Sequence, residues 1–276
     1  MKKLCFILAA LALTPPATAA SVLGCLVDPN RVADVGSPVV AVIDRVEVER
    51  GDTVKKGQVL VVLRATVERA AYEAARSRAA ASADLQAADA NARFNQERLQ
   101  RAEDLVRQGF ISQQALDQAR NDAQLAEQKQ AQAREQQTVS AHERGMAEAQ
   151  LTQRIIRSPI DGVVAERFMS AGERADDKPL LRIASIDPLR VQLVVSTALF
   201  GQIKPGQLAN VMPDLPGVGA LVARVTMVDK VTDPASNTFR VQLSLPNPDL
   251  SLPAGLRCKA EFGSQPPVTR REMQAL

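Results

Sequence analysis

Hydrophobic and polar residues follow two different periods along the chain, and the change of period divides it. In residues 35–65 and again in 158–185, a glycine-acid turn separates short β-branched runs, which is typical of strands. In residues 66–157, small apolar residues recur every seven positions, as in paired helices. β-like runs return in residues 186–262. The pattern therefore predicts a mixed α and β chain whose β structure is interrupted by a long helical segment.

The helical segment is expected to form two helices that fold back on each other. All 16 prolines of the chain lie outside residues 39–158, and the only glycines of the helical segment are Gly109 and Gly145, so helix breakers are rare there. Gly109 suits the left-handed residue at a helix end, and Ser112 is a good N-cap for a second helix. Two helices of about 40 residues give an antiparallel hairpin roughly 60 Å long.

The heptad pattern places small and polar residues where the two helices meet. Small side chains let the backbones approach closely, and polar ones keep the contact weak and adaptable. The predicted seam of the first helix consists of Ala71, Arg78, Leu85, Ala92, Leu99 and Val106, together with Ala74, Ala81, Ala88, Asn95 and Ala102. That of the second consists of Leu116, Ala123, Gln130, Gln137, Arg144 and Leu151, together with Ala119, Ala126, Ala133, Ser140 and Ala147.

The two segments that flank the helices repeat each other at a shift of 121 residues. Each copy is too small to bury both faces of its strands, so the two half-motifs are expected to pack together. The identical pairs are Ser37-Pro38 with Ser158-Pro159, Val42 with Val163, Gly51 with Gly172, and Leu60 with Leu181.

Downstream of Ile186, turn residues such as Pro205-Gly206 separate several β-like runs. This spacing predicts a small antiparallel barrel, followed by a short polar tail at 263–276. The expected strands are Leu189–Val195, Leu208–Met212, Leu221–Val228, Thr238–Leu245 and Leu256–Phe262.

Composition narrows the range of functions. The 276 residues carry a net charge of +3, and aromatic residues make up 3%, so neither a basic surface nor stacking platforms favour nucleic acid as a partner. His142 is the only histidine, which leaves histidine-rich metal sites and Ser-His-Asp catalysis without their main residue. The sequence therefore predicts a protein that is not an enzyme, with no catalytic residue, cofactor or metal.

Residues 1–20 have the features of a secretory signal peptide. Lys2 and Lys3 precede an apolar stretch, Leu4–Leu13, that is too short to span a bilayer, and small residues follow it as a cleavage site. Export to an oxidising compartment is expected, and residues 21–34 then form an N-terminal segment of the mature chain.

The mature chain keeps two cysteines, Cys25 and Cys258. Paired cysteines are the rule in an oxidising compartment, so a disulfide is expected if the fold brings the two ends together. The alternative is a bacterial lipobox, Val22-Leu23-Gly24-Cys25, which would make Cys25 a lipid-anchored N-terminus. Residues 14–24 separate the apolar stretch from Cys25, whereas lipoprotein signals usually run straight into the cysteine; this favours the disulfide.

The order of these segments resembles the periplasmic adaptor (membrane fusion protein, HlyD-like) family of tripartite efflux systems. The resemblance implies an elongated chain with a lipoyl-like barrel-sandwich hybrid, interrupted by a long antiparallel α-helical hairpin and followed by a small antiparallel β-barrel. It also implies a periplasmic adaptor that bridges an inner-membrane transporter, proton-driven or ATP-driven, to a TolC-like outer-membrane channel, as a ring of six copies. The segments that carry the resemblance are Val46–Leu60, Arg157–Val164 and Asp233–Phe239.

The predicted hairpin tip carries a further resemblance. Adaptors that dock on TolC-like channels share an Arg-x3-Leu-x6-Ser pattern there, and this chain has Arg101, Leu105 and Ser112 at that spacing. The resemblance implies an arginine fork that donates to channel carbonyl or carboxylate groups, a leucine that packs in a groove between helices, and a serine at the tip. Each residue also has a purely structural interpretation, as a solvated arginine, a leucine beside the seam and an N-cap serine.

The half-motifs allow an alternative function, and the chain departs from the family pattern at one point. The half-motifs also resemble lipoyl and biotinyl carrier domains, whose modified lysine occupies the turn between the halves. Here the hairpin replaces that turn, and Lys178 lies inside the second half. In addition, many pump adaptors continue into a membrane-proximal domain, whereas few residues follow Phe262 in this chain. A complete fourth domain is therefore not expected, and residues 21–34 are expected to supply at most a remnant strand.

Overall fold

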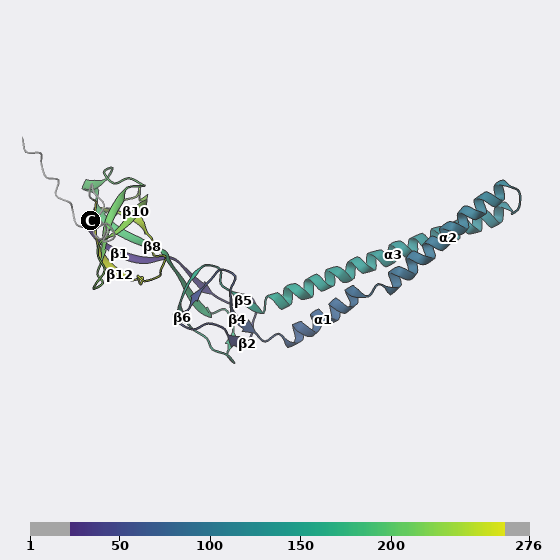
Figure 1. Cartoon of the computed structure of the whole chain (residues 1–276), viewed down its shortest axis with the longest axis horizontal. Coiled ribbons are helices and arrows are strands. Elements are labelled where there is room, and N and C mark those ends of the chain that lie inside the picture. Colours follow the sequence, from purple (N-terminus) through teal and green to yellow (C-terminus); the bar gives the residue numbers. More distant parts are fainter. Residues whose placement is uncertain (1–22, 263–276) are drawn as a thin grey trace, which may run out of the picture. The chain divides into compact units, whose positions relative to one another are not determined.

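The computed structural model describes residues 23–262. The predicted signal peptide and the tail at 263–276 lie outside the described residues. The chain divides into two compact units (Figure 1). One unit runs from Asp34 to Ile183; of the described residues, the other combines those from Leu23 to Ala33 with those from Ala184 to Phe262.

The first unit contains a small β structure of short antiparallel strands, together with the first residues of the long strand β8. One sheet has the order β5-β4-β2-β7, and β3 pairs with β6, which is the neighbour of β8. The strands are β2 (Ala41–Val46), β3 (Thr53–Val54), β4 (Val59–Leu63), β5 (Ile155–Arg157), β6 (Gly162–Arg167), β7 (Arg174–Ala175) and β8 (Leu181–Ser196).

Reciprocal hydrogen bonds join the two half-motifs of this unit. The N–H of Gly51 donates to the carbonyl of Val164 at 2.9 Å, and the N–H of Gly172 donates to the carbonyl of Ile43 at 2.8 Å. The repeat shift of 121 residues relates these two bonds to each other. Both glycines have positive φ, 96° and 88°, a conformation that few other residues adopt at low cost. The expectation that the half-motifs pack together is confirmed.

The helical hairpin contains three helices rather than the two expected: α1 (Thr66–Ala80), α2 (Ala83–Arg107) and α3 (Gln113–Thr152). As predicted, Gly109 ends the outward run with φ of +76°. Ser112 is the N-cap of α3, because its hydroxyl accepts a hydrogen bond from the N–H of Ala115 at 3.3 Å. Buried alanines line the contact between α2 and α3.

The predicted seam holds for α2 and for almost all of α3, but it is wrong for α1. Ala81 adopts an extended conformation with ψ of 116°, and the interruption removes one residue from the seven-residue repeat. The residues of α1 that are buried or half-buried are therefore Glu68, Tyr72, Ala75 and Ala79. The side chains that the unbroken pattern had placed in the seam are exposed, namely Ala71, Ala74, Arg78 and Ala81.

The base of the hairpin is held by adjacent strands. The N–H of Leu63, at the end of β4, donates to the carbonyl of Arg154 at 2.8 Å, and β4 pairs with β5. The Arg154 guanidinium binds the Glu68 carboxylate, and both side chains are only about one-fifth exposed. An ion pair with that degree of burial is better shielded from salt than the surface pairs further along the helices.

The second unit is a six-stranded antiparallel barrel with the order β1-β12-β9-β10-β11-β8, closed by pairing of β1 with β8. A short 3₁₀ helix, Thr197–Leu199, follows β8. The five strands expected from the sequence are present. Besides β8, the barrel strands are β1 (Leu23–Val35), β9 (Leu208–Pro213), β10 (Leu221–Val228), β11 (Thr238–Leu245) and β12 (Leu256–Glu261).

The sixth barrel strand, β1, corrects the expectation for residues 21–34. In the described part of this segment, Leu23–Val27 pair with β12 as part of the barrel rather than forming a remnant of a further domain. The sequence Asp28-Pro29-Asn30 is typical of a turn, so the residue pattern does not indicate a strand here. The structure accommodates it because these residues lie beyond the stretch that pairs with β12.

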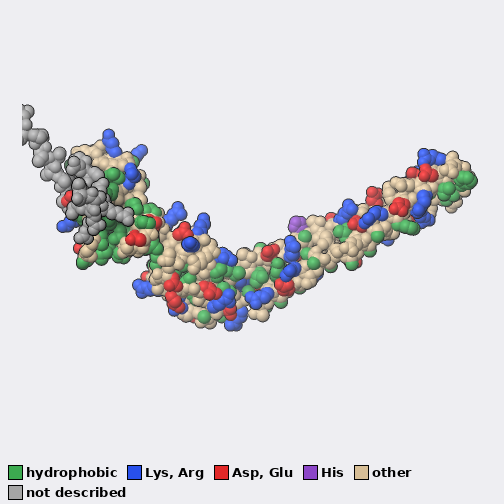
Figure 2. Space-filling model, in the orientation of Figure 1, with side chains coloured by type: hydrophobic (Ala, Val, Ile, Leu, Met, Phe, Trp, Pro, Cys, Tyr) green, Lys and Arg blue, Asp and Glu red, His purple; other side chains and the backbone are tan. Residues whose placement is uncertain are grey.

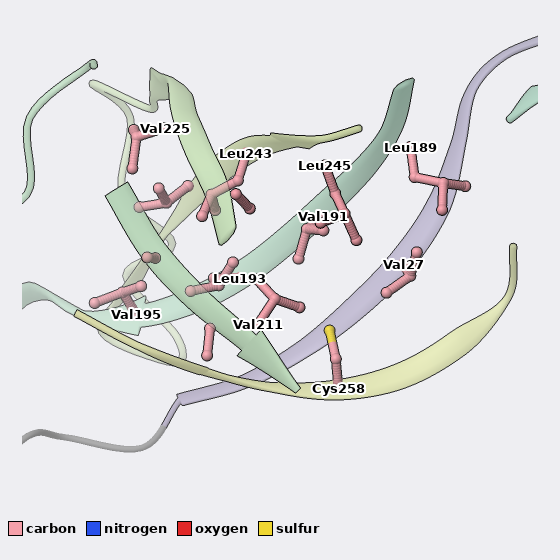
Figure 3. Packing of buried hydrophobic residues seen from close by; sticks show 14 of the residues in the cluster. Val27, Leu189, Val191, Leu193, Val195, Val211, Val225, Leu243, Leu245 and Cys258 are labelled. Carbon is pink, nitrogen blue, oxygen red and sulfur yellow. The ribbon is translucent and has the colours of Figure 1, made fainter. Parts of the chain in front are cut away.

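Alternating side chains fill the barrel (Figure 3). In β8, Leu189, Val191, Leu193 and Val195 are at most 1% exposed, whereas the residues between them face outward to varying degrees. This period of two is the pattern that a strand with one buried face requires.

One polar side chain, Asn247, is buried beside this core, with 1% of its surface exposed. Its amide nitrogen donates to the carbonyls of Ile186 and Leu252, both at 3.0 Å. Its amide oxygen accepts from the N–H of Leu252 at 3.1 Å. The side chain thus satisfies three backbone groups, two of them on the buried Leu252, and it fixes the loop after β11 to β8.

We expect Asn247→Ala to lower the free energy of unfolding by about 3 kcal/mol, because it leaves buried backbone groups without partners. Asn121→Ala, which removes an exposed amide from α3, should change it by less than about 0.5 kcal/mol. Urea denaturation of the full chain measures both. Equal effects of the two substitutions would contradict the role given to Asn247.

Candidate functional site

The tip of the hairpin brings the three residues of the predicted docking pattern to the surface. Arg101 and Leu105 lie four residues apart on one face of α2, and Ser112 lies across the turn at the start of α3. All three are exposed, Leu105 by 40%. Hydrophobic side chains are visible at this end of the hairpin (Figure 2).

The turn itself presents a hydrophobic residue that the sequence interpretation did not include. Phe110 is 72% exposed, although its backbone is fixed: its N–H donates to the carbonyl of Leu105 at 2.9 Å. The preceding Gly109 donates to Val106 at 3.0 Å. An aromatic residue directly after the glycine that ends a helix was the signal that could have identified it.

A small hydrophobic cluster supports the tip from within. Ala102, Leu116 and Ala119 are at most 8% exposed, and three half-buried side chains pack on them, those of Leu99, Val106 and Ile111. The cluster holds the ends of α2 and α3 together. The exposed tip residues are therefore presented from a packed platform.

The charges around the tip are mostly paired. Arg98 binds Asp122 at 3.2 Å across the two helices, and Arg107 binds Asp104 within α2. Within residues 23–262, the structure pairs Arg101 with no acidic side chain. Its guanidinium is exposed and offers donors in a planar fork that suits carbonyl and carboxylate acceptors.

The residues of the half-motif segments build turns and join the two halves. The Asp52 carboxylate accepts the N–H of Glu49 at 2.8 Å. The N–H of Lys56 donates to the Asp161 carboxylate at 2.7 Å, and that of Gly57 donates to the carbonyl of Ser158 at 2.8 Å. These residues have a structural role in the barrel-sandwich hybrid.

The Asp233–Phe239 segment also forms a turn. The Asp233 carboxylate accepts the N–H of Ala235 at 2.9 Å, and this hydrogen bond is the main cause that lowers the pKa of Asp233. Asn237 adopts φ of 53°, and its side-chain oxygen accepts from the Thr197 hydroxyl at 2.7 Å. Hydrogen bonding thus explains the residue types of this segment.

A second group of charges lies in the first unit. Arg182 binds both carboxylate oxygens of Asp34, at 2.6 and 3.0 Å, and the carboxylate of Glu166 at 3.3 Å. The hydrogen bond from Arg182 is the main cause that lowers the pKa of Asp34. All three side chains are well exposed, so the group fits a surface network better than a reactive site.

The side chains considered for other chemistry are isolated. Lys178 is exposed, and its backbone N–H donates to the carboxylate of Asp176. His142 lies on the surface of α3, where Figure 2 shows the histidine side chain. Between Leu23 and Phe262, no cluster of three or more histidine, cysteine or acidic side chains is arranged to hold a metal ion.

None of the helices within residues 23–262 is both long enough and apolar enough to cross a bilayer.

A family model described as the CzcB-like barrel-sandwich hybrid domain matches residues 31–185, which is more than half of the chain. The chain belongs to the membrane fusion protein family. The match covers both half-motifs and the hairpin between them, and it agrees with the reciprocal pairing found in the structure. The family resemblance and the fold class expected from the sequence are thereby confirmed.

Relatives of known name agree with this family. The pyoverdine export membrane fusion protein PvdR of Pseudomonas putida is 30% identical over 186 residues, covering 66% of this chain and 47% of the relative. The cobalt-zinc-cadmium resistance protein CzcB of Cupriavidus metallidurans is 25% identical over 231 residues, covering 82% and 41%. The chain thus spans about half the length of the curated relatives it matches.

A solved membrane fusion protein has the same fold. MacA from Actinobacillus actinomycetemcomitans superposes with a TM-score of 0.73 over 88% of this chain and 78% of its own, at 22% sequence identity. At that identity the likeness speaks for the fold alone.

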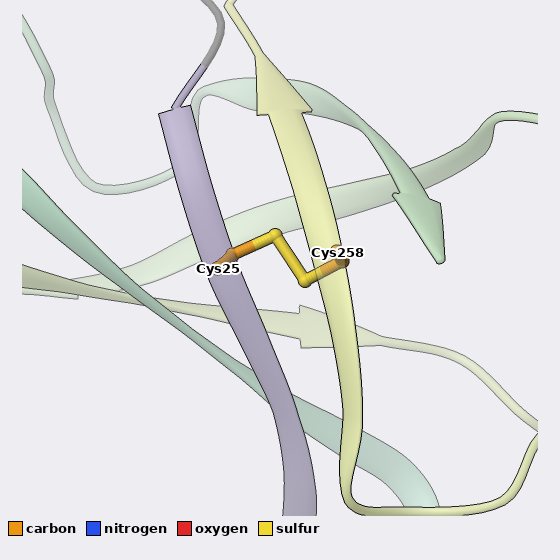
Figure 4. The surroundings of a disulfide bond; sticks show 2 residues. All are labelled: Cys25 and Cys258. Atoms are coloured by element: carbon orange, nitrogen blue, oxygen red, sulfur yellow. A yellow bond between two sulfur atoms is a disulfide. The ribbon is translucent and has the colours of Figure 1, made fainter. Parts of the chain in front are cut away.

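Cys25 and Cys258 meet in the barrel. Cys25 of β1 lies directly opposite Cys258 of β12 in the antiparallel ladder, with 4.8 Å between their Cα atoms, and the structure joins them by a disulfide (Figure 4). The bridge links residues 233 positions apart. It connects the first strand of the barrel to the last.

We expect the mature protein to carry this bridge in cells. Intact mass of the purified protein should rise by the mass of two thiol hydrogens on reduction. Cys258→Ser should abolish this change and lower stability, by at most about 5 kcal/mol on the chain-entropy estimate. A diacylglyceryl adduct on Cys25 would contradict the bridge and support the lipid anchor instead.

Proposed function

We propose that the chain is a non-enzymatic periplasmic adaptor of a tripartite efflux or secretion system. In this proposal it links an inner-membrane transporter to a TolC-like outer-membrane channel, with the hairpin directed to the channel. Family membership supports the adaptor role. The observation that carries the channel assignment is the tip, where an unpaired arginine and two hydrophobic side chains are exposed on a packed platform.

Each tip residue has a role that its geometry permits. The Arg101 guanidinium donates to carbonyl or carboxylate groups of the channel. Leu105 packs into a groove between channel helices, and Phe110 extends the apolar contact. The Ser112 hydroxyl already accepts the N–H of Ala115, and its own hydrogen remains free to donate to the channel.

The remaining parts of the proposal follow from the family. The mature chain acts in the periplasm, associated with the inner membrane through its transporter, as a ring of six copies. A lipid anchor at Cys25 is the alternative mode of association. The names of the two relatives refer to pyoverdine and to cobalt, zinc and cadmium, so neither cargo is transferred to this chain. Crosslinking in cells with mass spectrometry identifies the transporter as proton-driven or ATP-driven.

A covalent carrier is the alternative function. A lipoyl or biotinyl carrier presents its lysine at the turn between the half-motifs. Here β4 leads into α1 and α3 returns to β5, so the hairpin takes the place of that turn. Lipoate or biotin on Lys178 in the intact mass of the mature protein would favour the carrier over the adaptor.

We expect Arg101→Asp to weaken binding to the outer-membrane channel by about tenfold or more, because it reverses an unpaired charge at the contact. Export falls with it, while the circular dichroism spectrum stays unchanged. Arg93→Asp, on the same helix further from the tip, is the matched control and should retain binding. Normal capture of the channel by Arg101→Asp would refute the docking assignment.

Leu105→Ser should weaken the same contact by about 1 kcal/mol, or roughly fivefold, because only the exposed two-fifths of the side chain remain to be buried on docking. Leu105→Met, which keeps the apolar area, should bind nearly as well as the unmodified chain. Binding titrations with purified channel measure both. Equal losses for the two variants would show that apolar burial is not the cause.

A further inference from the structure

The outer wall of the barrel has a hollow of about 610 Å³ that the described chain leaves open. It crosses four neighbouring strands in the order β12-β1-β8-β11. Leu26 of β1 and Val194 of β8 form its apolar centre and are 41% and 57% exposed. Arg257 of β12 lies opposite Leu26 in the ladder. Arg240 of β11 lies opposite Val194. We call this surface the wall hollow; it has an apolar centre with an arginine on each side.

The wall hollow is positively charged. The residues that line it include two arginines and no acid. Lys259, two residues beyond Arg257 on β12, is exposed and adds a further cation beside it. Asp28 lies two residues from Leu26 on β1, and its carboxylate accepts a hydrogen bond from the Gln192 amide at 2.9 Å. An apolar centre between cations suits an occupant whose apolar side chain lies between carboxylates.

Gly24, which also lines the wall hollow, has no structural explanation within the chain. A Cβ at this position would meet no atom within 4 Å, and the φ of Gly24 lies outside the range that favours glycine. Glycine weakens a strand and often marks a place where a ligand or another backbone approaches closely. Gly24 therefore indicates that something approaches the wall from outside.

The loop between β10 and β11 has the complementary pattern. Val231 is 82% exposed, more than any other large hydrophobic residue within 23–262. It lies between two acids, Asp229 and Asp233. All three residues line one shallow hollow of about 410 Å³ and so share one side of the loop, whereas Lys230 does not line it. We call residues 229–233 the acidic loop.

Hydrogen bonds to β11 hold the acidic loop in place. The N–H of Asp229 donates to the carbonyl of Arg240 at 2.9 Å, and the N–H of Asp233 donates to the carbonyl of Thr238 at 2.8 Å. Val231 is nevertheless exposed, and it does not line the wall hollow of its own chain. The loop thus presents an apolar side chain between two carboxylates in a conformation that is already formed.

The acidic loop and the wall hollow lie near the same end of the barrel. Thr238, which follows the loop, pairs with Ser196 at the end of β8, and Gly24 lies at the start of β1. Around the barrel, six strands give steps of about 60°. The loop joins β10 and β11, and the centre of the wall hollow lies between β1 and β8. The two surfaces are therefore two steps, or about 120°, apart.

We propose that the acidic loop of one copy of this chain docks in the wall hollow of the next copy. Val231 of the partner subunit packs on Leu26 and Val194, and its two flanking carboxylates face Arg240 and Arg257. The contact rests on the ring of copies proposed above, and it names the surfaces through which neighbouring barrels meet.

This contact is compatible with a closed ring. It joins two different surfaces, so it repeats in one direction around the ring and leaves every copy in the same orientation. In a ring of six, the two neighbours of each copy lie about 120° apart, which is also the angle between the loop and the hollow. Each copy then uses its loop towards one neighbour and its hollow towards the other.

The size of the contact suits a reversible assembly. A loop of this length buries on the order of 300 Å² per partner, well below the 800 Å² of a standard interface. A single contact is therefore weak. Ring closure supplies further stability because each copy then makes two contacts, and opposite charges at the contact make it sensitive to salt.

Crosslinking of mixed single-cysteine chains tests the contact. Full-length Val231→Cys and Val194→Cys chains are mixed and treated with a short bis-maleimide, which does not react with the native disulfide. A heterodimer is expected from the mixture and little product from either chain alone. In the matched control, Leu208→Cys replaces Val194→Cys; Leu208 is 41% exposed on β9, outside the wall hollow, and should give no product.

The other products overturn the proposal. Homodimers of Val231→Cys indicate that two loops meet, and homodimers of Val194→Cys indicate that two walls meet. Equal coupling of Val231→Cys to Val194→Cys and to Leu208→Cys indicates random collision. Absence of any product indicates that the loop does not dock on a second copy.

Sedimentation equilibrium of two variants gives an independent readout. Gly24→Val fills the wall hollow, and Arg257→Asp reverses one of its charges; each should weaken self-association at least about tenfold. Gly24→Val should not lower the free energy of unfolding, because valine favours strands. The matched controls are Gly219→Val, where a Cβ also has open space, and Arg224→Asp, an exposed change on β10. Both controls should associate normally.

The result can be separated from channel docking. Arg101→Asp changes only the hairpin tip, so its chains should form the same crosslink and the same assembly as the unmodified chain. Unchanged assembly of Gly24→Val and Arg257→Asp, with the barrel folded by circular dichroism, would overturn this contact and leave the adaptor proposal standing. Loss of channel capture by Arg101→Asp with the crosslink retained would support both.

Discussion

The reciprocal backbone pairing of the two half-motifs is the interaction on which the rest of the structure depends. The N–H groups of Gly51 and Gly172 each reach across to the other half, and β4 pairs with β5 where the hairpin begins and ends. Bringing Leu63 and Ile155 together closes a long loop, at an entropic cost of about 4 kcal/mol for a flexible chain. The helices reduce this cost because they fold the intervening residues locally. Loss of the pairing would release both ends of the hairpin.

The hairpin combines a firm base and a packed tip with a weaker middle. Its base has a half-buried ion pair and strand pairing, and its tip has a small hydrophobic cluster. Between them, the contact consists largely of alanines and glutamines, with polar bonds such as that from Gln137 to the carbonyl of Ala79 at 2.7 Å. Such a seam binds weakly and can adapt, which suits helices that contact further helices from other subunits.

Much of this fold could be predicted from the sequence, because its main signals are local. Gly109 and Ser112 mark the turn of the hairpin, the repeat at a shift of 121 residues identifies the half-motifs, and alternating residues identify the barrel strands. The failures arise where a local signal misleads. One residue is lost from the seven-residue repeat at Ala81, and this shifts the seam of α1. Asp28-Pro29-Asn30 has the residue types of a turn, so the strand β1 could not be recognised.

The candidate site was predicted less completely than the fold. The spacing of Arg101, Leu105 and Ser112 was visible through a family pattern, whereas the exposure of Phe110 depends on how the turn directs its side chain. Four exposed hydrophobic side chains of α2 and α3 were not singled out from the sequence, because each lies next to a seam residue in the heptads; they are Phe94, Leu125, Val139 and Met146.

Photo-crosslinking from the tip in cells tests the central claim most directly. A photoreactive phenylalanine analogue at position 110 replaces an aromatic side chain that is already exposed. The account predicts a crosslink to an outer-membrane channel protein from position 110 and none from the exposed Gln96, which lies about 20 Å further from the tip. Crosslinks from position 110 to inner-membrane or soluble proteins alone, or equal yields of the channel from both positions, would contradict it.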